Sequence, residues 1–107
     1  MTTFDKREDA FEKKFAHDAE LQFKAGARRN KLLGLWAAGL LGKAGAEAEA
    51  YAKTVVAADF EEAGDADVFR KIRRDFDAAG VTQSDHQIRR TLDETMQTAI
   101  AQIRSET

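Results

Sequence analysis

Histidine, serine and carboxylate side chains are the groups of this chain that could do acid–base, nucleophilic or metal chemistry. His17 precedes Asp18 and His86 follows Asp85, but neither histidine has a partner at the H-x-x-x-H spacing that holds zinc on a helix. Ser84 lacks the strand–turn–helix context of a hydrolase nucleophile, and its position is explained by the capping of a helix. Cysteine is absent, which excludes disulfides and thiolate sites. We therefore predict no catalytic residue, no metal site, no cofactor and no enzyme activity.

The stretch GLLGKAG comes closest to a phosphate-binding loop. Around Gly42 and Lys43, however, Ala37 and Ala44 occupy the positions of the first glycine and of the Ser/Thr. No strand pattern precedes the stretch. Adenine nucleotide binding by a helical bundle therefore stays open as a third hypothesis that no motif supports.

The charges of the chain are nearly balanced. Lys and Arg number 17 and Asp and Glu 19, so the net charge is −2 and does not select nucleic acid or an anionic membrane as partner. Three basic clusters nevertheless stand out: Arg28, Arg29 and Lys31; Lys71, Arg73 and Arg74; Arg89 and Arg90. If they converged on one face, the chain would be a small helical module that binds nucleic acid. We keep this as the alternative function; the leading interpretation expects no nucleic-acid partner.

The length of 107 residues suits one domain. The most apolar window, Leu32 to Leu41, has about half of the roughly 20 residues that cross a bilayer. The beginning, MTTFDKRED, lacks the apolar core of a signal peptide. We predict a soluble cytoplasmic protein without membrane insertion.

Apolar residues recur at spacings of three and four throughout the chain, which predicts an all-α protein. Glycines divide it, because Gly42, Gly45, Gly64 and Gly80 follow apolar runs and proline is absent. Asp65 and Ser84 are candidate N-caps. The expected helices are about 5–41, about 46–61, from Asp65 to Gly80, and from Ser84 onward. We predict a small antiparallel four-helix bundle.

Each expected helix has one apolar face. These faces predict a core of Leu33, Trp36, Ala37, Leu40 and Leu41, then Ala48, Tyr51, Ala52, Val55, Val56 and Phe60, then Val68, Phe69, Ile72 and Phe76, and finally Ile88, Leu92, Met96, Ala99 and Ile103.

An aromatic ridge near the start does not join this core. On a helix, Phe4, Phe11 and Phe15 fall within an arc of about 40°. Along the same line, polar or bare positions follow until Leu33. We therefore predict a mobile arm, residues 1–18, that becomes helical when a partner covers the phenylalanines, attached to a bundle domain of residues 19–107. Two alternatives stay open: the segment folds back onto the bundle, or its phenylalanines have no binding role.

Two long stretches carry a family resemblance. FDKREDAFEKKFAHDAELQFKAGARRNKLLGLWAAGLLG and, later, YAKTVVAADFEEAGDADVFRKI resemble the zeta subunit, the ATPase inhibitor of alphaproteobacterial F-type ATP synthases. The resemblance covers about residues 1–76. It implies a four-helix fold whose protruding or disordered N-terminal region enters the catalytic head between alpha and beta subunits, near gamma, and blocks hydrolysis. It also implies a non-enzymatic regulator that is peripheral to the inner membrane through the synthase.

The inhibitory segment carried over from the family is Met1 to about Ala19. Within it we expect the phenylalanines to act as buried anchors and the charged residues to set the register. The predicted partner-binding residues are Phe4, Arg7, Glu8, Phe11, Lys14, Phe15 and Asp18. Family members often have Glu where this chain has Gly26 and Gly39, and we expect Gly26 to make the junction between arm and bundle flexible.

Overall fold

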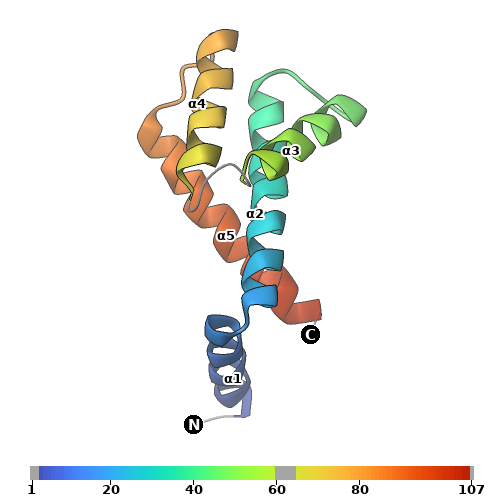
Figure 1. Cartoon of the computed structure of the whole chain (residues 1–107), viewed down its shortest axis with the longest axis vertical. Helices are drawn as coiled ribbons and strands as arrows, with labels where there is room; N and C mark the ends of the chain where they lie inside the picture. Colours follow the sequence, from blue (N-terminus) through green and yellow to red (C-terminus); the bar gives the residue numbers. More distant parts are fainter. Residues whose placement is uncertain (1–2, 60–64, 107) are drawn as a thin grey trace.

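The protein folds into helices joined by short connections (Figure 1). This computed structural model describes the backbone of residues 3–59 and 65–106, and the side chains of residues 10–59 and 65–106. The described ranges contain α1 (Thr3–His17), α2 (Ala19–Leu40), α3 (Ala46–Ala58), α4 (Ala66–Ala79) and α5 (Asp85–Glu106). The all-α prediction is confirmed, but the helix count of four is wrong.

The additional helix arises because the long N-terminal helix is divided at Asp18. The backbone of Asp18 is extended, with φ −108° and ψ 102°. Its carboxylate accepts hydrogen bonds from the backbone N–H groups of Glu20 (3.0 Å) and Leu21 (3.2 Å), so it is the N-cap of α2. Since α2 runs through Gly26 without interruption, the junction lies at Asp18 rather than at Gly26.

The other predicted helix ends are largely as expected. Gly42 and Gly45 have φ values of 78° and 56° in the turn between α2 and α3, and Gly80 ends α4 with φ 72°. Ser84 Oγ accepts a hydrogen bond from the Gln87 N–H at 3.0 Å, as its capping spacing predicts. Asp65 precedes α4 without a side-chain capping bond. The second helix ends at Ala58 with Asp59 as its C-cap, before the predicted end at about residue 61, and Phe60 lies outside the described residues.

The main hydrophobic core joins α2 to the other three helices of the bundle. Its buried members are Leu33, Ala37, Val55, Val68, Ile72, Phe76, Ile88 and Leu92, and we call them the main cluster. Trp36 packs edge-on against Phe76, with ring centroids 5.7 Å apart. Most predicted core residues meet here, but Leu40 is exposed, and Met96 and Ile103 belong to a separate apolar group.

Helices α2 and α3 approach each other closely at Gly34. A Cβ atom built on Gly34 would lie 2.7 Å from the Cα of Ala52, which is shorter than any tolerable contact. The glycine is therefore required at this crossing, and it brings Val55 of α3 against α2.

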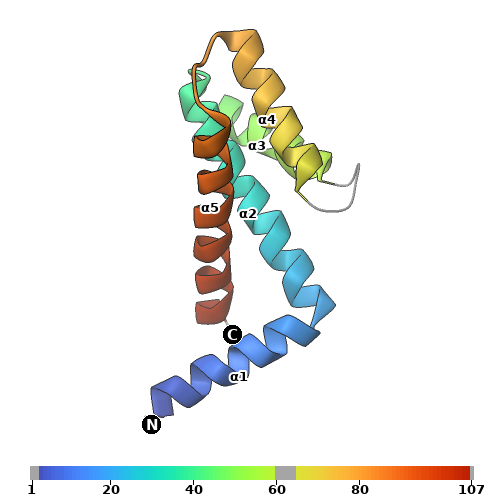
Figure 2. The ribbon, with the colours of Figure 1, turned by 90° about the vertical axis from the view of Figure 1, so that its left-hand side faces the viewer.

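A second apolar group lies at the other end of α2 and α5. Leu21, Ala25 and Ile103 are buried there, with the partly buried Met96 and Ile100 packed against them, and we call these five residues the distal cluster. Phe11 and Phe15 of α1 also pack against its buried residues. The molecule is elongated, 50 × 27 × 26 Å, and α1 crosses its lower end beside the C-terminal turns of α5 (Figure 2).

Candidate functional site

Helix α1 is the candidate site that the sequence singles out, and it lies at one end of the molecule (Figures 1 and 2). Phe11 and Phe15 lie on one side of it, with ring centroids 6.2 Å apart and ring planes 27° from parallel. Lys14, between them in sequence, is exposed. Phe4, Arg7 and Glu8 belong to α1, but their side chains lie outside the described part of the chain. Their predicted contacts stay predictions.

The expectation that the protein leaves this aromatic ridge uncovered is wrong for its two described rings. Phe11 and Phe15 are half-buried against the distal cluster. They do not join Trp36 and the main cluster. These two rings therefore pack back onto the protein, at a separate small patch formed by α2 and α5. Mobility of residues 1–18 stays a prediction.

Two residues near the start of α2 hold the end of α1 in place. Asp18, predicted to contact a partner, uses its carboxylate within the chain as the cap of α2. Gln22 donates its side-chain amide to the carbonyl oxygens of Phe15 (3.2 Å) and Ala16 (3.0 Å), in the last turn of α1. Because terminal carbonyls of a helix have no partner within it, these bonds satisfy the end of α1.

The distal cluster also depends on where α5 ends. Glu106 makes a bidentate ion pair with Arg28 of α2, including an Nη2–Oε2 distance of 3.1 Å, and Lys24 lies 3.8 Å from the same carboxylate. The hydrogen bond from Arg28 lowers the pKa of Glu106. The sequence interpretation missed Leu21, Ala25 and Ile100 as the surface that receives the ridge. They could have been found from the sequence, because each lies three or four residues from another apolar residue of the same helix.

Arg29, assigned from sequence to a basic cluster, is buried instead. Its side chain lies 2.8 Å from the Asp65 carboxylate and 3.9 Å from that of Asp59, and its Nε donates to the Asn30 side-chain oxygen at 2.9 Å. Asp59 and Asp65 are the described residues on either side of segment 60–64. Arg29 therefore joins both ends of the connection between α3 and α4.

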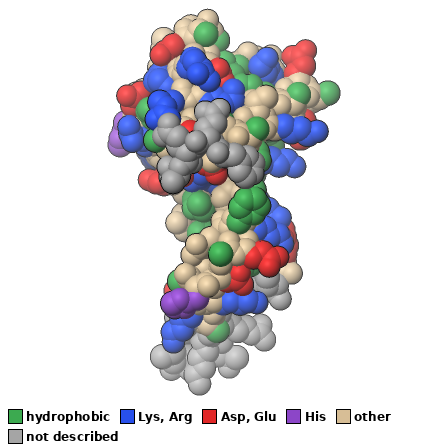
Figure 3. All heavy atoms as spheres, viewed as in Figure 1, with side chains coloured by type: hydrophobic (Ala, Val, Ile, Leu, Met, Phe, Trp, Pro, Cys, Tyr) green, Lys and Arg blue, Asp and Glu red, His purple; other side chains and the backbone are tan. Residues whose placement is uncertain are grey.

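The remaining basic clusters are largely compensated by carboxylates. Arg73 pairs with Asp77 and Asp85, and Arg90 pairs with Glu94 at 2.8 Å. Blue and red side chains alternate over the face shown in Figure 3. The arginine clusters thus offer little uncompensated charge for binding phosphates, which weakens the nucleic-acid alternative.

Tyr51, Lys71 and Asp75 form a polar contact between α3 and α4. Asp75 accepts hydrogen bonds from the Tyr51 hydroxyl (2.7 Å) and the Lys71 ammonium (2.8 Å). Burial raises the pKa of Tyr51, and the neighbouring carboxylate raises it further. Burial also tends to raise the pKa of Asp75, but the bonds from Lys71 and Tyr51 outweigh it and lower that pKa overall. This arrangement positions α4 on α3 and is not a reactive site.

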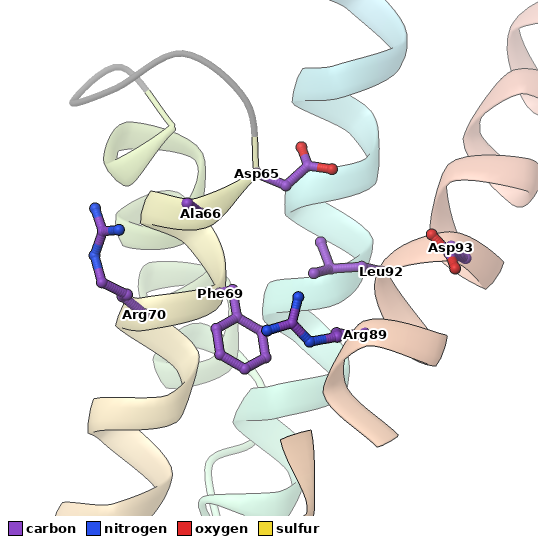
Figure 4. Close-up of a pocket in the computed structure, with 7 residues that line it drawn as sticks. All are labelled: Asp65, Ala66, Phe69, Arg70, Arg89, Leu92 and Asp93. Carbon is purple, nitrogen blue, oxygen red and sulfur yellow. The ribbon is translucent and has the colours of Figure 1, made fainter. Parts of the chain in front are cut away.

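A groove of about 620 Å³ lies between α4 and α5 (Figure 4). The guanidinium of Arg89 lies over the ring of Phe69, 4.3 Å from its centroid. The lining residues are Asp65, Ala66, Phe69, Arg70, Arg89, Leu92 and Asp93. With two arginines and two aspartates, the composition of this groove does not select one class of ligand by charge.

The two histidines lie at the surface. His17 and His86 are both exposed, and the described residues contain no group of three His, Asp or Glu side chains that could hold a metal ion. Among the described helices, none is both long and apolar enough to cross a bilayer.

Comparisons with known proteins identify the family of the chain and a similar solved structure. Residues 1–102 match the family described as ATPase inhibitor subunit zeta. A structure described as a solution NMR structure is 50% identical to this chain, covers 81% of it and 99% of its own chain, and superposes with a TM-score of 0.73. No curated protein matches the sequence. The chain therefore belongs to the ATPase inhibitor subunit zeta family, whose members are regulatory and not catalytic.

Proposed function

We propose that this protein inhibits ATP hydrolysis by inserting α1 into the catalytic head of the F-type ATP synthase, at an interface between an alpha and a beta subunit and close to gamma. Membership of the inhibitor family supports the regulatory role and implies binding to the synthase. The choice of subunits and of α1 as the inserted element is our proposal. It places the protein in the cytoplasm, peripheral to the inner membrane through the synthase.

The observation that carries the proposal is the attachment of α1. The helix joins the remainder of the molecule through the single non-helical residue Asp18, and it lies at the end opposite the main cluster. It can therefore change its position without disturbing that core. Phe11 and Phe15 share one side of α1, as in amphipathic helices that bind a groove.

Inhibition of this kind needs no chemistry in the inhibitor. A helix that fills a subunit interface stabilises one catalytic conformation over the next, so rotation driven by hydrolysis stops. Because α1 is already helical in the single chain, binding costs less ordering entropy than folding of a coil would. We assign anchoring to Phe4, Phe11 and Phe15, and the setting of the register to Arg7, Glu8 and Lys14.

The test compares the full-length protein with a variant that lacks residues 1–17, both added to the cognate synthase during ATP hydrolysis. Keeping Asp18 preserves the cap of α2, so the remaining helices stay folded. We expect the truncation to abolish inhibition while the thermal transition of the main cluster persists. Equal inhibition by both proteins would place the active surface outside α1.

A double substitution tests the anchors within the intact chain. Phe11→Ala with Phe15→Ala should reduce inhibition at least about tenfold, because aromatic anchors dominate binding energies of this kind. Lys13→Ala is the matched control, because Lys13 is exposed in the same helix and away from the ridge. Equal loss of inhibition in the control would show that helix content, not the rings, matters.

A further inference from the structure

The rings that we propose as anchors are already in contact with the protein itself. Phe11 and Phe15 pack against the distal cluster, whose buried members are Leu21, Ala25 and Ile103. A ring face cannot contact this cluster and a synthase subunit at the same time. Docking of α1 on the synthase therefore requires the contact within the chain to open.

We propose that the distal cluster is an autoinhibitory docking site for the protein's own α1, and that it competes with the synthase for Phe11 and Phe15. The competition rests on the function proposed above. The contact within the chain does not, because it follows from the structure alone.

The closed arrangement is fixed at the α1–α2 joint by polar groups. Asp18 caps α2 with an extended backbone, which turns the chain between the helices. Gln22 then bonds to the carbonyls of Phe15 and Ala16, at 3.2 and 3.0 Å. Besides releasing the two rings, opening requires rotation about one residue and the exchange of two exposed hydrogen bonds for water, whose net contribution to stability is small. The joint thus sets the direction of α1 in the closed state but contributes little free energy against opening.

Helix α5 contributes part of the landing surface, beside Leu21 and Ala25 of α2. Ile103 is fully buried between α5 and α2, and the bidentate Arg28–Glu106 ion pair holds the end of α5 against α2. Met96 and Ile100 are only half-buried, and they pack against the same buried residues as the phenylalanines. Ile103 therefore supports the landing surface, whereas Met96 and Ile100 form its replaceable part.

Competition has a defined effect on affinity. When only the open state of a protein can bind, its apparent affinity equals the intrinsic affinity multiplied by the fraction of molecules that are open. A closed-to-open ratio of about ten thus weakens inhibition about tenfold. Shortening a side chain of the landing surface should therefore strengthen inhibition, which is the opposite of what shortening an anchor does.

Methyl NMR of the full-length protein tests the contact itself. We expect Phe15→Ala to shift the methyl resonances of Met96 and Ile100, because the ring current of Phe15 is lost. Resonances of Ile72 in the main cluster should not move. Lys13→Ala is the control on the same helix. Unchanged Met96 and Ile100 resonances would overturn the proposal, whether or not the protein inhibits hydrolysis.

Inhibition assays with Ile100→Ala test the competition. We expect the concentration for half-inhibition to fall about three- to tenfold, since the open fraction rises. Leu40→Ala, a truncation at the exposed far end of α2, should leave it unchanged. Met96→Ala is a second landing-surface variant, and Trp36 fluorescence verifies that the main cluster of each variant is folded.

The outcomes separate this proposal from the proposed function. Weaker or unchanged inhibition by both landing-surface variants, with the main cluster folded, would overturn the competition. An absence of inhibition by the wild-type protein would instead contradict the proposed function, and the methyl resonances would still decide whether α1 docks on the distal cluster.

Discussion

The side-chain amide of Gln22 donates a hydrogen bond to the carbonyl oxygen of Phe15 across the break between α1 and α2, at 3.2 Å. Gln22 of α2 thus bonds to a free carbonyl at the end of α1, and Asp18 caps the start of α2. The bend that results brings the aromatic side of α1 onto the distal cluster. The position of the arm is therefore decided by a few polar groups at its joint, not by the length of the apolar ridge.

Loss of the cap at Asp18 should weaken the fold measurably. Asp18→Ala removes the acceptor for the Glu20 and Leu21 N–H groups, and we expect the free energy of unfolding to fall by about 1 kcal/mol. Urea unfolding at neutral pH measures the change. Asp18→Asn keeps a capping oxygen and should stay close to wild type. Equal stability of the two variants would show that the cap is dispensable.

The two apolar clusters should respond very differently to the same truncation. Phe76→Ala removes a fully buried ring of the main cluster and should cost about 3–5 kcal/mol. Phe15→Ala removes a half-buried ring, and we expect a loss of about 1–2 kcal/mol. Calorimetry of both variants makes the comparison. A similar cost at both positions would mean that α1 belongs to the core and does not open.

Two glycines of α2 should give opposite results when replaced by alanine. Gly34→Ala places a Cβ 2.7 Å from the Ala52 Cα, so α3 must move, and we expect a loss of about 1–3 kcal/mol. Gly39→Ala meets no atom within 4 Å and should gain up to about 1 kcal/mol from helix propensity. Thermal unfolding of the two variants decides. A neutral Gly34→Ala would contradict the close approach of α2 and α3.

The contact between Tyr51 and Asp75 should make stability depend on acid pH. Because the folded-state pKa of Asp75 is lowered below 3.8, its stabilising effect is present above that pH and is lost as the pH falls through the folded value. Tyr51→Phe removes one of the two hydrogen bonds, so we expect the pKa of Asp75 to rise and neutral-pH stability to fall by about 1 kcal/mol.

Carboxyl NMR titration of Asp75 checks this shift, and unfolding at neutral pH and below the folded-state pKa checks the stability difference, which should shrink in acid. Asp77→Asn is the control, because it removes only an exposed ion pair with Arg73, so stability should change little. An unchanged pKa of Asp75 in Tyr51→Phe would contradict the role of the hydroxyl.

The helices and most caps of this protein can be read from its sequence because they depend on local chemistry. Gly80 and Ser84 end and begin helices through groups within a few residues, and the apolar spacing predicts the buried faces of Ile72 and Ile88. The break at Asp18 was missed because apolar spacing does not register a single capping residue. Its local sign was the sequence DAEL, in which Asp18 precedes an acid in the first turn.

The partner of the aromatic ridge could not be read from sequence. Phe15 and Ile100 are far apart along the chain, and they pack against the same buried residues only because α2 bends away at Asp18 and α5 returns along α2. Both depend on the relative directions of whole helices, which local spacing does not determine. The ion pairs of the basic clusters could not be predicted for the same reason. Arg29 lies near Asp59 and Asp65 only in the folded chain.

Helices α2 and α5, of 22 residues each, are shared between a large core at one end and a small one at the other. Amide protons in the early turns of α2 and the late turns of α5 should therefore exchange with solvent well before those beside Leu33 and Ile88. Slow and fast segments then coexist within one continuous helix, so the chain unravels from the end where α1 is attached.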